Sequence, residues 1–292
     1  PVPAKVPGDI LTDLESAGGP DPYFNITWRD PEFIRTWNEG VWTYSTNFSS
    51  PAGAATHFLL VFDGIRMGAM ISLNDKFLGN ATDQFLRYTF DIDCSVLVCG
   101  EKQNILTVAF GHALAIETHG RYTYSQTIDW APTMLTSGFP GDHTTFGFGI
   151  WKSVYLLPVH SAAISQLVPH TFYQGSYPTS RLSDSNHAGF EVRTLVELIC
   201  PLKAGCSGTL TVQGDWPGAV KESSHVSSLP IGTSNVTVVL AAEQTKDVML
   251  WHPHGHGAQP RYSIRATFTP SVGPSEISPA PAVATRKIGF RT

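Results

Sequence analysis

The stretch His57-Phe58-Leu59-Leu60-Val61-Phe62-Asp63-Gly64 contains the pattern that decides the fold. The apolar run after His57 is too short for a buried helix and has the length of a buried strand. Asp63-Gly64 is a dipeptide typical of tight turns, so we expect the chain to reverse there. The segment therefore predicts a β-strand over residues 57–62 that ends in a turn.

Similar strand-like segments recur on both sides of this stretch. Residues 67–73 lead through the turn pair Asn74-Asp75 into residues 76–78, and residues 86–92 alternate with a period of two. After about residue 160 the pattern starts again. Further segments of this kind are residues 104–110, 151–158, 190–199, 209–213, 235–240, 262–268 and 287–291.

Helical signals are few. Residues 9–14, with Asp9 as N-cap, and residues 30–36, with Pro31 at the first helical position, each predict one or two turns. Neither is long enough to cover a parallel sheet, so the sequence predicts two consecutive all-β sandwiches with a boundary between residues 158 and 169. Residues 270–284, which are rich in proline, are expected to be a loop or edge segment.

The composition excludes several classes of protein. Among 292 residues, 42% are hydrophobic and 15% are charged, against about 25% charged in an average domain. The 26 glycines and 21 prolines argue against a coiled coil or a helical repeat array. A net charge of −5 predicts no basic face, so no nucleic-acid partner is expected. No apolar run approaches the roughly 20 residues that cross a bilayer, so no membrane partner is expected either.

The four cysteines fall into two close pairs, Cys94 with Cys99 and Cys200 with Cys206. An even count at short spacing fits two small disulfide loops, although four reduced thiols remain an alternative. A zinc site is less well supported, because neither pair has CxxC spacing or a nearby pair of histidines.

Four N-x-S/T sequons begin at Asn25, Asn47, Asn80 and Asn235. One sequon says little, but four of them beside paired cysteines and few charges favour the secretory pathway, with a lysosomal or extracellular destination. We expect glycosylation at these four asparagines.

The remaining motifs give no sign of a cofactor. Nucleotide-binding fingerprints and the GxSxG elbow are both missing from the sequence. His252, His254 and His256 alternate and could share one side of an extended segment, which suggests a metal site. The intervening Pro253 and the two glycines favour a rigid turn instead, so we expect no metal.

Residues 111–149 form a long irregular segment of the kind that is usually a functional loop. Within it, Asp129 precedes Trp130. A carboxylate can accept two sugar hydroxyls while an indole face packs on the C–H face of a sugar ring. Asp129 and Trp130 are therefore candidate substrate-binding residues, against the alternative that Asp129 only bonds to backbone N–H groups.

Several motifs together resemble glycoside hydrolase family 2, in its β-mannosidase branch. Each motif is short, but they occur in the family's order from one end of the chain to the other. They are Val6-Pro7-Gly8-Asp9, Asp21-Pro22-Tyr23, Trp42-Thr43-Tyr44, Phe62-Asp63-Gly64, Ile71-Ser72-Leu73-Asn74, Phe85 to Asp91, Gly149-Ile150-Trp151-Lys152, Trp251 to Gly257 and Arg286 to Thr292.

The resemblance implies a jelly-roll-like sugar-binding β-sandwich over residues 1–160 and an immunoglobulin-like β-sandwich over residues 161–292. In the family, a (β/α)₈ barrel follows, and two of its glutamates perform retaining hydrolysis about 5–5.5 Å apart. Such a barrel needs about 250 further residues, so no catalytic residue is expected in this chain. The resemblance also makes residues 252–257 a structural turn. It implies that the first sandwich lacks its first edge strand, unless another polypeptide supplies it.

The family's WDWG loop reaches the barrel mouth, and its Asp binds sugar hydroxyls in the −1 subsite. Here Asp129 and Trp130 match that loop, while Ile128 and Ala131 replace its first Trp and its Gly. The resemblance thus assigns this role to Asp129, and the two replacements point to altered specificity or to an inactive relative. The expected partners are a companion chain or fragment with the barrel and a carbohydrate with a terminal β-linked sugar. The alternative function is a stand-alone carbohydrate-binding or scaffold module.

Overall fold

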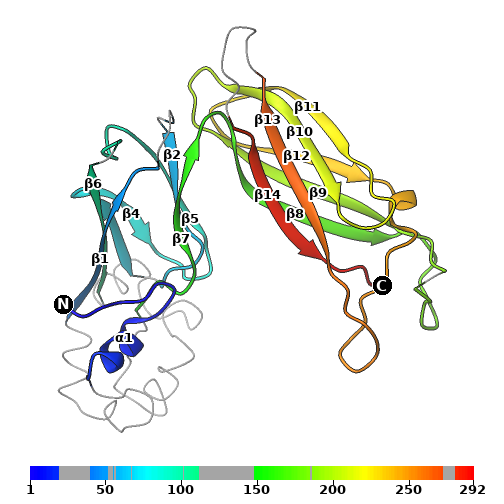
Figure 1. Ribbon diagram of the computed structural model, residues 1–292, viewed down its shortest axis with the longest axis horizontal. Coiled ribbons are helices and arrows are strands. Elements are labelled where there is room, and N and C mark those ends of the chain that lie inside the picture. The colour runs from blue at the N-terminus through cyan, green and yellow to red at the C-terminus, as the bar shows by residue number, and fades with distance from the viewer. Residues whose placement is uncertain are drawn as a thin grey trace. The chain divides into compact units, whose positions relative to one another are not determined.

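The computed structural model describes residues 1–19, 40–51, 55, 57–66, 68–100, 102–111, 148–184, 186–271 and 280–292. The chain divides into two compact units, Pro1–Pro158 and Val159–Thr292. In the described ranges, both units consist mainly of β-strands (Figure 1). The predicted all-β fold class is confirmed, with a jelly-roll-like sandwich followed by an immunoglobulin-like sandwich.

The first unit pairs a four-stranded sheet with a three-stranded sheet across one apolar core. In spatial order, the larger sheet contains β1 (Val41–Ser49), β6 (Gln103–Gly111), β3 (Ala69–Leu73) and β4 (Lys76–Ala81). The smaller sheet contains β5 (Tyr88–Asp93), β2 (His57–Phe62) and β7 (Val154–Val159). Strands β1, β4, β5 and β7 are therefore edge strands.

The predicted strand over residues 57–62 is confirmed as β2. Its side chains from Phe58 onward are all buried, as expected for a continuous apolar run in a central strand. The turn between β3 and β4 is also where the sequence predicts it. Asn74 and Asp75 adopt φ values of 51° and 61°, the left-handed conformation that a two-residue hairpin turn requires.

The helix α1 (Ile10–Ser16) begins where the sequence predicts. The Asp9 side chain accepts a hydrogen bond from the Thr12 backbone N–H at 3.1 Å, so Asp9 is the N-cap. The predicted helix over residues 30–36 lies outside the described residues. None of the helices in the described part of the chain has the length and apolarity that crossing a membrane requires.

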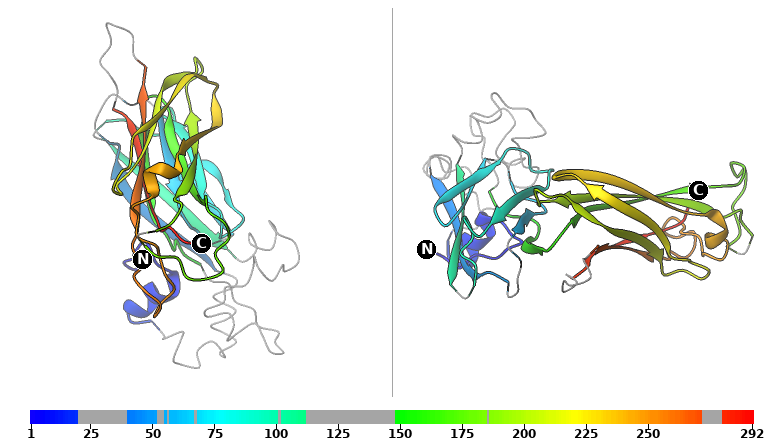
Figure 2. Two further views of the ribbon diagram at one scale, coloured as in Figure 1. Left: turned by 90° about the vertical axis from the view of Figure 1, so that its right-hand side faces the viewer. Right: turned by 90° about the horizontal axis from the view of Figure 1, so that it is seen from above.

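The second unit is also a pair of sheets packed face to face (Figure 2). One sheet has the order β11 (Glu222–Leu229), β10 (Cys206–Gly214), β13 (Tyr262–Pro270) and β14 (Ala282–Ile288). The other has the order β12 (Gly232–Leu240), β9 (Phe190–Cys200) and β8 (Ala163–Tyr173). A short 3-10 helix, η2 (Ala242–Thr245), follows β12.

Both predicted disulfides are present, Cys94–Cys99 and Cys200–Cys206. The first closes a turn after β5. The second connects the end of β9 to the start of β10, which belong to opposite sheets of the second unit.

The division between the two units falls between Pro158 and Val159, at the start of the range expected for the boundary. Residues 163–173 form the strand β8, and Pro169 is tolerated within it because β8 lies at the edge of its sheet in the described ranges. The structure corrects two sequence expectations. The polar stretch 222–229 forms β11 although it lacks an apolar alternation. The last strand, β14, begins at Ala282 rather than at Lys287, so it starts within the expected loop.

Candidate functional site

The predicted substrate-binding residues Asp129 and Trp130 lie outside the described residues, within the segment 112–147. Both ends of this segment are described. Phe110, near the end of β6, and Phe148 are fully buried, and their ring centroids lie 5.8 Å apart. The segment that contains Asp129 therefore leaves and re-enters the first sandwich at one place in its core.

Backbone hydrogen bonds join three distant parts of the chain at this place. The Ile10 N–H donates to the Phe148 carbonyl at 3.0 Å, and the Gly8 N–H donates to the Ile150 carbonyl at 2.9 Å. The Arg66 N–H donates to the Gly149 carbonyl at 2.9 Å. These bonds unite residues 8–10, 64–66 and 148–152, which we call the junction.

Two glycines allow the junction to close. A Cβ atom at position 149 would lie 2.6 Å from the Asp9 Cα atom, and a Cβ atom at position 64 would lie 2.8 Å from the Trp151 ring. Position 149 faces backbone atoms and position 64 faces the Trp151 side chain, and both approaches are too close for a Cβ atom without a shift of these neighbours. The VPGD, FDG and GIWK motifs, which are far apart in the sequence, therefore meet in space because each packs against another.

Polar side chains also support the junction. The Arg87 Nε lies 2.8 Å from the Asp63 carboxylate, and the Arg66 Nη1 donates to the Gln84 Oε1 at 2.6 Å. Gln84 is 4% exposed, and this bond gives its buried amide oxygen a partner. Sequence reasoning did not single out Arg66 or Gln84, and no pattern in the sequence marks them.

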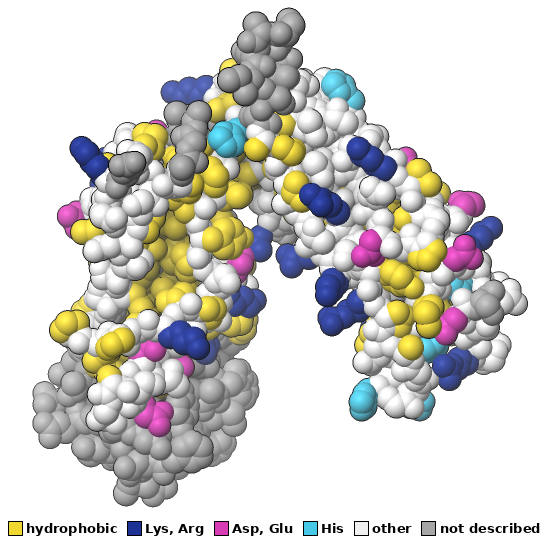
Figure 3. All heavy atoms as spheres, in the orientation of Figure 1, with side chains coloured by type: hydrophobic (Ala, Val, Ile, Leu, Met, Phe, Trp, Pro, Cys, Tyr) yellow, Lys and Arg dark blue, Asp and Glu magenta, His cyan; other side chains and the backbone are white. Residues whose placement is uncertain are grey.

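A second feature of the first sandwich is an apolar groove of about 1030 Å³. Hydrophobic side chains gather in this hollow between β1 and β7 (Figure 3). Its walls include the inward-facing residues Trp42, Tyr44 and Phe48 of β1 and Leu156 of β7. The N-terminal residues from Pro1 onward also line it. Among the described strands, β1 and β7 each stand at the edge of their sheet, so the groove lies between two sheet edges.

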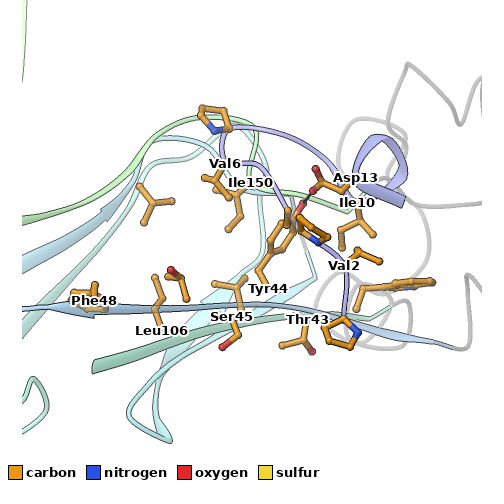
Figure 4. Close-up of a pocket in the computed structure, with 18 of the residues that line it drawn as sticks. Val2, Val6, Ile10, Asp13, Thr43, Tyr44, Ser45, Phe48, Leu106 and Ile150 are labelled. Carbon is orange, nitrogen blue, oxygen red and sulfur yellow. Dashed lines mark hydrogen bonds between the residues drawn. The ribbon is translucent and has the colours of Figure 1, made fainter. Parts of the chain in front are cut away.

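The Asp13 carboxylate on the groove wall accepts two hydrogen bonds. The Tyr44 hydroxyl donates to it at 3.2 Å (Figure 4). The Lys5 backbone N–H donates to it at 3.1 Å. Burial raises the pKa of Tyr44 above its usual range, and the negative charge of Asp13 raises it further. Tyr44 therefore stays neutral in the folded protein at physiological pH.

Among the described residues, the groove lacks the pair of carboxyl groups that a retaining glycosidase uses. Such an enzyme needs two carboxyl groups across one sugar bond, and Asp13 is the single carboxylate among the lining residues. The groove can bury apolar surface, but it cannot supply an acid–base pair. The signal for it in the sequence is the alternation of Trp42, Tyr44 and Phe48 in a strand at the edge of its sheet.

The histidine segment forms a turn. The His252 N–H donates to the Ala258 carbonyl at 2.9 Å, and the His256 N–H donates to the Pro253 carbonyl at 3.0 Å. His252 alone has an anchored ring, with its Nε2 3.4 Å from the Asp184 carboxylate, whereas His254 is exposed. Within the described ranges, no group of three or more histidine, cysteine or acidic side chains is placed to hold a metal ion.

The three sequons within the described ranges all lie on edge strands. Asn47 is on β1, Asn80 on β4 and Asn235 on β12. The fourth sequon, at Asn25, lies outside the described residues.

Comparison with known proteins gives a consistent picture. Residues 1–141 match the family model for the glycosyl hydrolase 2 galactose-binding domain-like region. A β-mannosidase of Rattus norvegicus is 24% identical over 298 residues, which is 91% of this chain and 30% of the relative. A β-mannosidase A of Aspergillus aculeatus is 26% identical over all of this chain and 32% of its own length. The chain thus spans about a third of the relatives that it matches.

Solved structures agree on the fold. The β-D-mannosidase from Dictyoglomus thermophilum superposes with a TM-score of 0.64 at 20% identity, over 99% of this chain and 34% of that one. The exo-chitosanase from Amycolatopsis orientalis gives a TM-score of 0.65 at 17% identity, over 99% of this chain and 30% of that one. Both likenesses extend through the two sandwiches.

Proposed function

Because the chain resembles the N-terminal region of glycoside hydrolase family 2 β-mannosidases, we propose that it is the noncatalytic N-terminal portion of a retaining β-mannosidase-like exoglycosidase. The observation that carries this proposal is a match along nearly the whole chain to enzymes about three times as long. The catalytic glutamates then lie on a barrel formed by other residues, as a companion fragment or as part of one longer polypeptide. The substrate class is a carbohydrate with a terminal β-linked sugar.

Asp129 is the residue through which this portion would take part in the reaction. Its carboxylate would accept hydrogen bonds from hydroxyls of the terminal sugar and so orient the sugar for attack by the barrel. The junction supports this role, since it fixes both ends of the segment that contains Asp129 to a rigid core. The Trp130 ring would pack against the C–H face of the sugar.

The test of this role is Asp129→Ala in the native assembly that contains this chain. We expect kcat/KM for an aryl β-mannoside to fall at least about tenfold, equivalent to about 1.4 kcal/mol of transition-state stabilisation. The thermal unfolding of the first sandwich should not change. Glu15→Ala, at an exposed position of α1 in the same unit, is the matched control. An unchanged kcat/KM for Asp129→Ala would remove this residue from the site.

The location proposed for the protein is the secretory pathway, with a lysosomal or extracellular destination. Two disulfides support it, because disulfides persist in oxidising compartments. The alternative function, a stand-alone carbohydrate-binding module, predicts that residues 1–292 bind a sugar without any barrel. Calorimetric titration of this chain with mannose, beside mass spectrometry of the copurifying polypeptides, separates the two functions.

A further inference from the structure

The outer face of the sheet β1-β6-β3-β4 has almost no charge. Of the residues in its four strands, Lys76 alone is charged, and its ammonium group donates to the Ser95 carbonyl. Four large apolar side chains are nevertheless exposed on this sheet: Val41 at 72%, Phe77 at 59%, Ile105 at 49% and Met70 at 43%. In the described ranges, no further strand pairs with β1 or β4 on the outer side of the sheet, and an uncharged surface with exposed apolar side chains and such edges favours self-association.

Two sequons lie on this same face, one on each of its edge strands. In the strand register, Asn47 of β1 stands directly opposite Ile105, and Asn80 of β4 stands directly opposite Met70. Directly opposite residues have Cβ atoms about 4.5–5.5 Å apart. A sugar attached to either asparagine would therefore lie beside the exposed apolar side chain across from it.

The third described sequon has a different setting. Asn235 of β12 stands opposite Glu197, and the neighbouring strand β9 also contributes Glu191 and Arg193. This sheet already has charged side chains, so a glycan at Asn235 has less apolar surface to cover. Asn235 is thus an internal control for the other two sites.

We propose that Asn47 and Asn80 carry N-linked oligosaccharides that shield this outer face and block both of its edges against strand pairing. The proposal depends on the secretory location proposed above. In the transfer, the asparagine Nδ2 bonds to C1 of the first N-acetylglucosamine of a lipid-linked oligosaccharide, while the C1–O bond to the lipid diphosphate breaks. The diphosphate leaves with the electron pair, and the amide proton passes to a base of the transferase.

The first experiment is site occupancy in the protein secreted from a eukaryotic cell. Peptide mass spectrometry after amidase release in heavy-oxygen water marks each glycosylated asparagine as labelled aspartate. We expect label at Asn47 and Asn80. Label at Asn235 with none at Asn47 and Asn80 would overturn the proposal while leaving the secretory location intact. If none of the sequons carried the label, both the shielding proposal and the secretory location would be contradicted.

The second experiment tests the shielding. Ser49→Ala and Thr82→Ala each remove one sequon, whereas Ser49→Thr and Thr82→Ser keep it. We expect each alanine variant to lower the yield of secreted monomer by about threefold, because apolar surface becomes exposed. Thr237→Ala, which removes the Asn235 sequon, should change the yield much less. An equal loss for Thr237→Ala would contradict the shielding role.

A rescue experiment separates shielding from any effect of the substitutions on folding. In the Ser49→Ala background, Ile105→Thr replaces the uncovered apolar side chain by a polar residue that favours strands. We expect Ile105→Thr to restore the monomer yield. Trimming the wild-type glycans to one N-acetylglucosamine should preserve the monomer, whereas complete removal should not. Failure of the rescue, or loss of monomer on trimming, would count against a glycan that covers Ile105.

Discussion

The first sandwich is open along one side, whereas the second is closed around a buried aromatic cluster. In the first, Trp42, Phe48 and Leu156 are only half-buried because they face a groove of about 1030 Å³. In the second, the fully buried Phe290 packs against Trp216 at 5.3 Å between ring centroids and against Phe190 at 5.3 Å.

This difference indicates different tasks for the two sandwiches. The second sandwich needs no further surface to cover its aromatic cluster, because two sheets linked by the Cys200–Cys206 disulfide enclose it. The first combines a rigid junction with apolar surface that its own described residues do not cover. In the described ranges, the first sandwich therefore leaves apolar surface available for a contact, whereas the second encloses its own core.

The largest expected effect concerns the aromatic cluster. Phe290→Ala should lower the free energy of unfolding of the second unit by about 3–5 kcal/mol, because it leaves a cavity in a close-packed core. Phe48→Ala, on the groove wall, should cost at most about 1 kcal/mol in the first unit, since its ring is already partly exposed. Urea unfolding with probes in each unit measures both, and Val283→Ala, on an exposed face of β14, is the control. Equal losses in the free energy of unfolding for Phe290→Ala and Phe48→Ala would contradict the difference between the two sandwiches.

The next largest effect on the free energy of unfolding concerns the two disulfides. Replacing Cys200 and Cys206 by alanine should cost about 2 kcal/mol through the closed loop of the unfolded chain, plus the loss of two buried side chains. Replacing Cys94 and Cys99 should cost less, because Cys94 is exposed and the bridge does not join two sheets. Chemical unfolding of the two double variants ranks them. A larger loss of stability on removing Cys94–Cys99 than on removing Cys200–Cys206 would contradict this ranking.

The smallest expected effect sharpens the account of the groove. Tyr44→Phe removes the donor to Asp13 and should cost about 1 kcal/mol near neutral pH. Since the pKa of Tyr44 is raised in the fold, the unfolded chain loses this proton first as the pH rises above about 10. The stability due to Tyr44 is therefore intact below about pH 10 and declines above it. Tyr44→Phe should remove this alkaline decline, which is measured as the change of the unfolding midpoint between about pH 8 and pH 11. The same pH dependence of the midpoint in the wild type and in Tyr44→Phe would contradict the account.

Most strands could be predicted from the sequence where the pattern is local. Residues 57–62 and the Asn74-Asp75 turn needed only an apolar run and a residue pair that tolerates positive φ. Strand β11 could not be predicted, because the stretch 222–229 gains its place from pairing with β10 rather than from its own pattern.

The candidate site was less accessible to sequence reasoning. The junction depends on glycines whose missing side chains matter only when distant segments meet, as at Gly149 beside Asp9. The alternation of Trp42, Tyr44 and Phe48 marks an apolar face of β1, but it does not reveal that β1 and β7 have no further strand beside them in the described part of the chain. The role of Asp129 rests on resemblance, and the residue lies outside the described ranges.

The central claim is that this chain assists hydrolysis performed by carboxylates in other residues. The most direct measurement is to label the native, active enzyme with a mechanism-based glycoside inhibitor that traps the nucleophile, and to locate the labelled peptide. We predict a labelled glutamate on a barrel that lies outside these 292 residues. A label on any carboxylate within the two sandwiches, or hydrolysis by these residues alone, would contradict the account.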